Sequence, residues 1–292
     1  MNSFWVELLG ASAYLLRGKY STRVIEAGEG EPLLCLHGTG GHAENYIRNI
    51  APLARHFRVI AIDFLWHGRS QTTGFDSQVL PPLVDQVRDV LDTLKIERAH
   101  LEGQSLGGWV AMLFTLARPE RVAKLIVTTP MGYRPDPGAV PGYVEADPTP
   151  LRESNLAVLR DPSYDNIKAR LARLVFDPSI VSEESILVRQ TFYSDPAVNA
   201  VQRQLMTHYL GGTDPQRHVV TDAMARRISA PTLVYWGDKN FVPPAVGQHL
   251  ARTIPNGTFF SAPATGHWAQ FENFEVHNRE VLRFLAQEER TL

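Results

Sequence analysis

Two patterns of hydrophobic positions divide the chain. From Arg23 to about Gly132, short apolar runs alternate with amphipathic stretches. Runs that are rich in β-branched residues and apolar on both faces are typical of buried parallel strands. These runs are residues 32–38, 57–64, 99–105 and 122–130. Residues 79–96 and 105–120 between them have the apolar spacing of helices, and Ala13 to Glu26 alternates like an edge hairpin. Strand–helix alternation predicts a doubly wound, mostly parallel α/β sheet.

From about Tyr133 to Arg226 the pattern of hydrophobic and polar positions is different. A turn-rich stretch is followed by amphipathic helices at 165–176, 182–193 and 195–210, and no strand pattern is visible. Strand and helix patterns resume at residue 230 and continue to a last helix over 274–287. We therefore predict one α/β core, residues 1–132 and 227–292, split by a helical cap, residues 133–226, that covers the ends of the strands.

Composition narrows the possible partners. Hydrophobic residues make up 44% of the 292 positions, charged residues 21%, and the net charge is −2. This balance gives no reason to expect nucleic-acid or anionic-membrane partners. The single cysteine, Cys35, lies in an apolar run and is interpreted as a buried small hydrophobe. The first 20 residues make a poor signal peptide, and no apolar run approaches membrane-spanning length, so we expect a soluble cytoplasmic protein.

The strongest chemical signal is the G-x-S-x-G pattern at residues 103–107. It follows a predicted strand and precedes a predicted buried helix, which is the context of a nucleophile elbow. The sharp turn presents Ser105, and the helix N-terminus directs amides, including that of Leu106, toward developing negative charge. Ser105 is the expected nucleophile, and a structural serine is the alternative.

A serine nucleophile needs a base, and His267 is the best candidate. It follows a glycine in the loop between the last predicted strand and the last helix. The glycine-rich stretch after His37 can present backbone N–H groups, so we assign Gly40 and Gly41 to the oxyanion region. His37 itself is interpreted as structural, and His67 is a lesser candidate for contact with substrate.

The third triad member is expected after the strand that ends at Gly237. This stretch, GDKNFVP, offers Asp238 and Asn240. Clustered Cys/His spacing, a phosphate loop and a dinucleotide fingerprint are not found in the sequence, so we expect neither a metal nor a cofactor.

With these motifs in place, the sequence resembles the α/β-hydrolases, and more narrowly the meta-cleavage product hydrolases. Those enzymes cut a C–C bond in 2-hydroxy-6-oxohexa-2,4-dienoates. The similarity runs through LHGTGG, ENYIRNIAPLARHFRVIAIDF, GQSLGG, FDPSIVSEESILVRQ and GHWAQFENFEVHNREVLRFL. It implies that Asn45, Gln104, Arg189 and Trp268 contact substrate, although the family usually has asparagine at position 104. From the residues alone, Arg189 is better explained as a cap charge, Asn45 as a helix cap, and Trp268 equally well as packing.

The resemblance does not identify the acidic member of the triad. The family's acid lies three residues after the glycine, which leads to Asn240, but the segment is one residue short before FVP. We prefer Asp238 as the partner of His267, with Asn240 or a carboxylate from elsewhere as alternatives. The loop around His67 also departs from the family's usual version.

The expected function is serine-dependent C–C hydrolysis of a small-molecule ring-cleavage product. Arg189 and Asn45 would anchor the dienoate end, and His267 would assist ketonisation. An acyl-enzyme at Ser105 and direct attack by water both stay open. The alternatives are an esterase or lactonase on the same scaffold and a non-catalytic ligand-binding protein. An apolar cap favours a bulky or aromatic substrate tail, and the family resemblance favours a homo-oligomer.

Overall fold

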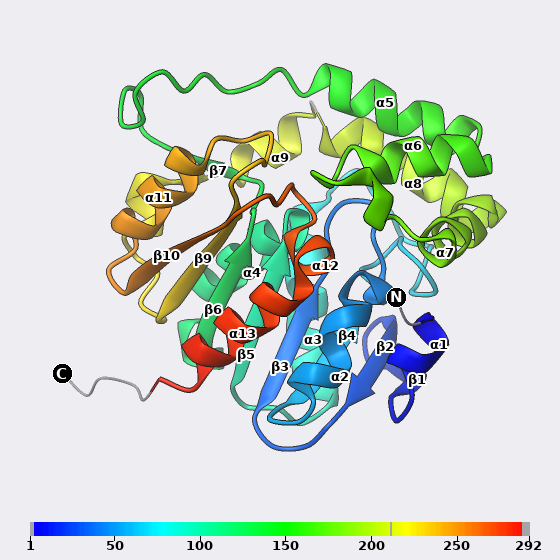
Figure 1. Cartoon of the computed structure of the whole chain (residues 1–292), viewed down its shortest axis with the longest axis horizontal. Helices are drawn as coiled ribbons and strands as arrows, with labels where there is room; N and C mark the ends of the chain where they lie inside the picture. Colours follow the sequence, from blue (N-terminus) through cyan, green and yellow to red (C-terminus); the bar gives the residue numbers. More distant parts are fainter. Residues whose placement is uncertain (1–2, 211, 288–292) are drawn as a thin grey trace.

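The computed structural model describes residues 3–210 and 212–287 of the chain. Within them one eight-stranded sheet has the order β1-β2-β4-β3-β5-β6-β9-β10 (Figure 1). β2 runs antiparallel to both of its neighbours, the edge strand β1 and β4, and the strands from β4 to β10 in this order run parallel to one another. The strands are β1 Ser12–Arg17, β2 Ser21–Ala27, β3 Pro32–Leu36, β4 Arg58–Ile62, β5 Ala99–Gln104, β6 Val122–Thr128, β9 Thr232–Gly237 and β10 Gly257–Ala262. The predicted doubly wound α/β sheet is confirmed.

Two hydrophobic cores lie on the two faces of the sheet. Along β3, Leu34 and Leu36 belong to one core, and Leu33 and Cys35 belong to the other. This alternation follows from the two-residue period of a strand, and both faces are apolar because helices cover both. The first core is shared with α3 Leu80–Thr93, α4 Leu106–Ala117 and α11 Pro244–Thr253, and the second with α2 Ile47–Leu53 and α13 Phe274–Leu285.

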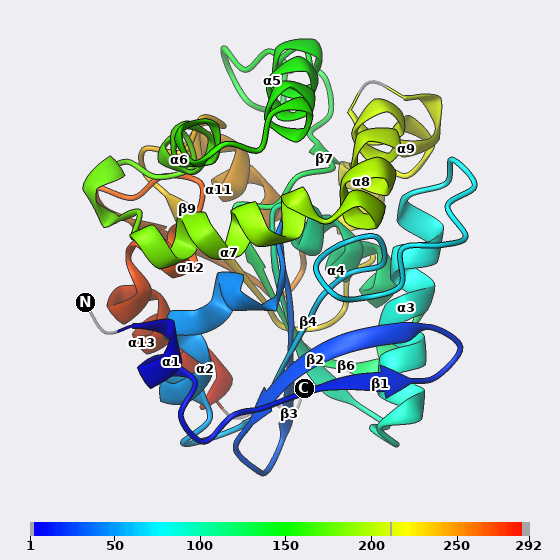
Figure 2. The ribbon, with the colours of Figure 1, turned by 90° about the vertical axis from the view of Figure 1, so that its right-hand side faces the viewer.

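Between β6 and β9 the chain forms the cap, whose helices lie in a layer beyond one end of the sheet (Figure 2). They are α5 Thr149–Arg160, α6 Tyr164–Ala172, α7 Glu183–Ser194, α8 Pro196–Tyr209 and α9 Thr213–Arg217. This region also holds two strands that no pattern in the sequence indicated, β7 Tyr133–Arg134 and β8 Val220–Thr221, which pair with each other. Strands of two residues are too short to show an alternating pattern in sequence.

Short elements complete the described chain. They are α1 Phe4–Glu7, α10 Asp222–Ala225, α12 Ala269–Glu272 and the 3₁₀ turns η1 Ala43–Tyr46, η2 Pro119–Arg121 and η3 Pro178–Ile180. In the described part of the chain, none of the helices has both the length and the apolar character needed to cross a bilayer.

Candidate active site

Ser105 lies on the turn between β5 and α4, with φ 55° and ψ −114°. A non-glycine residue rarely adopts positive φ, and such strain is characteristic of functional sites. Close packing explains the flanking glycines. A Cβ on Gly103 would lie 2.2 Å from the Gly107 carbonyl oxygen, and one on Gly107 would lie 2.0 Å from the Leu36 carbonyl oxygen. The turn is fixed by its own backbone, because the Ser105 carbonyl accepts hydrogen bonds from the N–H groups of Trp109 and Met131, both at 3.1 Å.

His267 follows β10 and lines the same pocket as Ser105. Its carbonyl oxygen accepts hydrogen bonds from the Gln104 side-chain amide at 3.1 Å and from the Thr129 hydroxyl at 2.8 Å, which fixes the backbone of the loop. The ring of Phe241 packs against the imidazole at 4.4 Å between centroids. Burial lowers the pKa of His267 to about 3, so the ring is neutral at physiological pH.

Asn240 is the hydrogen-bond partner of the His267 ring. Its Oδ1 lies 2.9 Å from Nδ1 of His267. With the amide oxygen as acceptor, Nδ1 carries the proton and Nε2 is left as the basic nitrogen. The side-chain amide of Asn240 is itself buried, and its Nδ2 has no partner among the described residues.

The preference for Asp238 as the partner of His267 is wrong. Asp238 Oδ1 accepts a hydrogen bond from the Thr265 N–H at 3.1 Å, and Oδ2 faces Lys239 Nζ at 3.4 Å. The reason is the length of the turn. The Asn240 N–H donates to the Gly237 carbonyl at 3.1 Å, and this tight turn places position 240, not 238, against the imidazole.

The oxyanion loop, residues 37–42, differs from the prediction at two positions. The Gly40 N–H donates to His67 Nε2 at 3.3 Å, and the Gly41 N–H donates to the Gly38 carbonyl at 2.9 Å. Both assigned amides are therefore engaged within the protein and are not available to substrate. Thr39 lines the pocket, and its N–H has no hydrogen-bond acceptor among the described residues. Leu106, the first residue of α4, has an N–H without an intrahelical partner, as the prediction requires.

His67 and His37 stabilise the oxyanion loop through buried hydrogen bonds. His67 lies outside the pocket lining. Its Nδ1 donates to the Leu65 carbonyl at 2.8 Å, and burial lowers its pKa to about 4, which leaves Nε2 free to accept from Gly40. His37 Nδ1 donates to the Gly38 carbonyl at 2.7 Å, and its Nε2 accepts from the Phe64 N–H at 3.0 Å. The structural interpretation of His37 agrees with these contacts.

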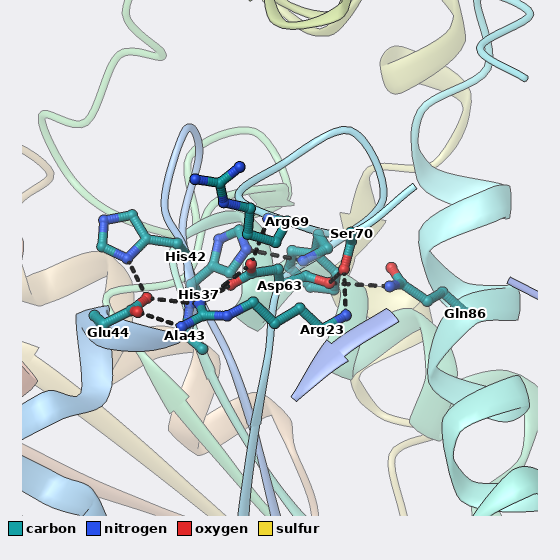
Figure 3. Close-up of polar contacts among 10 residues, drawn as sticks. Arg23, His37, His42, Ala43, Glu44, Asp63, Arg69, Ser70 and Gln86 are labelled. Atoms are coloured by element: carbon teal, nitrogen blue, oxygen red, sulfur yellow. Dashed lines mark hydrogen bonds and ion pairs between the residues drawn. The ribbon is translucent and has the colours of Figure 1, made fainter. Parts of the chain in front are cut away.

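A buried cluster of charged side chains joins the oxyanion loop to the loop after β4 (Figure 3). Asp63 accepts hydrogen bonds from the N–H groups of Ala43 at 2.7 Å and Arg69 at 2.8 Å. Arg23 lies between Asp63 and Glu44 and donates to both. Burial raises the pKa of Asp63 to about 6 despite the nearby guanidinium. This cluster is a scaffold of the loop and does not line the pocket.

The cap closes a pocket of about 350 Å³ over Ser105. Arg189 is 2% exposed, its Nη1 donates to the Gly40 carbonyl, and its Nη2 donates to Asn45 Oδ1 at 3.0 Å. Burial, with a contribution from the positive charge of Arg170, lowers the pKa of Arg189 to about 10. Arg189 is therefore not a solvated charge, it forms no salt bridge with an acid in the described part of the chain, and it lines the pocket together with Asn45.

Gln104 and Trp268 also line the pocket, where the family resemblance places them. Trp268 stacks on Phe271 at 3.9 Å between centroids, and its Nε1 is buried without a partner among the described residues. An indole N–H in that state is a donor available to a bound substrate. Gln104 combines its place in the lining with its bond to the His267 backbone.

The lining residues that sequence reasoning missed include Arg170, Arg173 and Phe241. Phe241 was visible only as part of the FVP segment. The two arginines are three residues apart in an amphipathic cap segment, where charges usually face solvent, so nothing local marked them. Among the described residues, no cluster of three or more His, Cys, Asp or Glu side chains could hold a metal ion.

Comparison with known proteins agrees with this geometry. Residues 31–274 match the model of the alpha/beta hydrolase fold family. A 2-hydroxy-6-oxononadienedioate/2-hydroxy-6-oxononatrienedioate hydrolase from Paraburkholderia xenovorans is 33% identical, over 92% of each chain. A 2-hydroxy-6-oxo-6-phenylhexa-2,4-dienoate hydrolase from Burkholderia cepacia is 32% identical, over 89% of this chain and 90% of that one.

A solved structure shows the same fold. A 2-hydroxy-6-oxo-6-phenylhexa-2,4-dienoate hydrolase from Rhodococcus superposes with a TM-score of 0.81 at 22% identity, over 95% of this chain and 100% of that one. The chain therefore belongs to the α/β-hydrolase family and, within it, to the meta-cleavage product hydrolases.

Proposed function

We propose that this enzyme hydrolyses the C–C bond of a 2-hydroxy-6-oxohexa-2,4-dienoate-type ring-cleavage product, with Ser105, His267 and Asn240 as its triad. The observation that carries the proposal is one pocket lined by Ser105, His267 and the buried pair Arg189–Asn45. A guanidinium and a carboxamide suit the carboxylate and the 2-oxygen of a dienoate. The names of the relatives support the substrate class but differ in the tail, which the proposal leaves open.

The chemistry divides into two stages. His267 first assists transfer of the 2-hydroxyl proton to C5, which converts the dienol to its keto form. An oxygen nucleophile, the Ser105 hydroxyl or a water activated by His267, then attacks the C6 carbonyl. The C5–C6 bond breaks, and its electron pair delocalises through C4 to the 2-oxo group. Proton return and net consumption of one water give a 2-hydroxypenta-2,4-dienoate and a carboxylic acid.

The oxyanion at C6 is assigned to the N–H groups of Thr39 and Leu106. Thr39 lines the same pocket as Ser105, Leu106 follows Ser105 in the chain, and neither N–H donates to another described group, unlike the N–H groups of Gly40 and Gly41. Removal of one such donor from an oxyanion hole typically costs about 10²–10³ in kcat. Arg170 helps to hold the backbone of the oxyanion loop in place, because its Nη2 donates to the Thr39 carbonyl at 3.1 Å.

Absorbance of a coloured dienol substrate tests the function. We expect the enzyme to bleach it, with release of equal amounts of the five-carbon dienoate and the acid, and to turn over simple aryl esters more slowly. The matched variant Ser105→Ala should not be labelled by a fluorophosphonate probe, and it should release neither product if the Ser105 hydroxyl is the attacking oxygen. If the enzyme turns over esters efficiently and does not bleach the dienol, the proposed C–C hydrolysis is contradicted and the enzyme is an esterase.

The proposal also includes a cytoplasmic location and a homo-oligomeric state. Cell fractionation and light scattering of the purified protein measure these directly.

A further inference from the structure

The loop that carries the proposed base lies directly against the cap. Its residue Gly266 packs on the backbone of cap segment 174–177, which connects α6 to η3. A Cβ on Gly266 would lie 2.8 Å from the backbone nitrogen of Phe176, so this position has no space for a side chain. The Trp268 N–H donates to the Leu174 carbonyl at 2.8 Å. The position of the histidine loop therefore depends on the position of this cap segment.

Glu272 joins the two segments through its carboxylate. It lies in α12, at the end of the core that faces the cap, and is 8% exposed (Figure 1). Its Oε2 accepts a hydrogen bond from the Gly266 N–H at 2.6 Å. Its Oε1 accepts from the N–H groups of Phe176 at 2.6 Å and Asp177 at 2.8 Å. One side chain thus binds the residue before His267 with one oxygen and the cap with the other.

These three bonds depend on the charge of Glu272. An ionised carboxylate accepts at both oxygens, whereas a protonated one carries a donor on one of them. Burial raises the pKa of the Glu272 carboxyl, and the three backbone N–H groups act in the opposite direction. Hydrogen bonds to an ionised acceptor are shorter and stronger than those between neutral groups. The carboxylate therefore fixes the distance between the histidine loop and the cap more firmly than a neutral side chain would.

The same part of the cap also contacts the oxyanion loop. Arg170, in the last turn of α6, donates from Nη2 to the Thr39 carbonyl at 3.1 Å. The Leu174 N–H donates to the Leu171 carbonyl at 3.0 Å, which connects the helix end directly to the cap segment. The loop of the proposed base and the loop of the proposed oxyanion donor are thus both held by residues 170–177.

We infer that Glu272 is a positioning residue that holds His267 in register with the oxyanion loop through cap segment 174–177. Glu272 lies outside the pocket lining, so it acts through the histidine loop and not on the substrate. The register matters because a displacement of about 1 Å can cost about a hundredfold in rate. The inference rests on the roles proposed for Ser105 and His267, and it applies equally to a dienoate and to an ester.

Glu272→Gln tests the inference with little change of shape. The amide accepts at its oxygen and donates at its nitrogen, so it cannot accept from both Gly266 and the cap. We expect kcat on the dienoate to fall at least about tenfold and KM to stay within about threefold, because the groups that line the pocket are unchanged. Labelling of Ser105 by a fluorophosphonate should slow by a similar factor and still reach completion. Glu275→Gln, at an exposed glutamate in the first turn of α13, should change neither rate.

Gly266→Ala tests the same contact from the side of the loop. The added methyl group would meet the Phe176 backbone nitrogen and displace the cap segment from the histidine loop. Gly266 is not among the glycines with positive φ, so the substitution acts through this contact and not through backbone strain. We expect the same loss of kcat and the same slower labelling. If Glu272→Gln does not fold, a fully active Gly266→Ala enzyme overturns the inference, and a folded but slow one supports it.

The outcomes separate this inference from the proposed function. Rates are compared at a temperature at which thermal unfolding shows the variants to be folded. Unchanged kcat and labelling in Glu272→Gln overturn the inference even if Tm is lower, because the residue is then only structural. A change confined to KM also overturns it. Slower labelling of Glu272→Gln, together with a wild type that bleaches no dienol, supports the inference and overturns C–C hydrolysis.

Discussion

At the scale of single residues, Asn240 determines how His267 acts. Its oxygen accepts the Nδ1 proton at 2.9 Å, which keeps Nε2 basic. A carboxylate in this position would also stabilise the imidazolium that forms when the serine is deprotonated, and an amide does not. The consequence is a triad that is correctly oriented but lacks a negative charge at its third position.

Alanine substitutions at the two candidate positions distinguish their roles. In Asn240→Ala, the buried Nδ1–H of His267 loses its acceptor, which costs about 1–3 kcal/mol and should lower kcat roughly ten- to a hundredfold. In Asp238→Ala, only the bond to the Thr265 N–H is lost, so we expect kcat within about threefold of the wild type. Steady-state kinetics on the dienoate measure both. Equal losses in the two variants would return Asp238 to the triad.

The sequence was sufficient to predict Ser105 and His267 as the first two members of the triad. It was not sufficient to identify the third member. Ser105 is marked by a local motif whose glycines are required by close backbone packing. The choice between Asp238 and Asn240 depends on the path of one turn, and a one-residue difference in length reverses it. Only the hydrogen bonds of Asn240 and Asp238 across that turn decide the matter.

At the scale of elements, the oxyanion loop and the turn that follows it are held by contacts from two separate parts of the chain, the loop after β4 and the cap helix α7. His67 binds its Gly40 N–H, Arg189 and Tyr193 of the cap bind its Gly40 carbonyl, and Asp63 binds the Ala43 N–H. All of these partners are distant in sequence, which explains why the motif predicted the loop but not which of its amides are available. The cap is therefore part of the catalytic loop's support as well as a cover.

Two glycine variants test this support. Gly40 and Gly138 both have positive φ, 64° and 80°, so alanine at either should cost about 1 kcal/mol in backbone strain. A Cβ on Gly40 would lie 2.2 Å from Tyr193 Oη, whereas one on Gly138 meets nothing within 4 Å. We expect Gly138→Ala to lower Tm by a few degrees at unchanged kcat, and Gly40→Ala to lower kcat at least about tenfold. Thermal unfolding and kinetics measure both, and a fully active Gly40→Ala enzyme would show that the loop tolerates displacement.

At the scale of the whole molecule, the fold brings together residues from both sequence segments of the core and from the cap. Ser105 follows β5, Asn240 follows β9 and His267 follows β10. Arg189 lies in α7 of the cap. The carboxyl ends of parallel strands meet at one edge, so residues that follow different strands converge there. The core was predictable because its strands are long, apolar on both faces and separated by strongly amphipathic helices. The paired strands β7 and β8 of the cap were not, because their pairing depends on residues more than 80 positions apart.

A pH–rate profile tests the neutral triad most directly. Catalysis requires neutral His267, whose pKa burial holds at about 3, so kcat/KM of the wild type on the dienoate should not fall between pH 8 and pH 5.5 through this group. In Asn240→Asp, the new carboxylate favours the imidazolium and raises that pKa. We predict that the variant loses activity as pH falls below its raised pKa, by about tenfold per unit, and gains activity on aryl esters at pH 8. Superimposable profiles for the two enzymes would contradict the assignment of Asn240 to the triad.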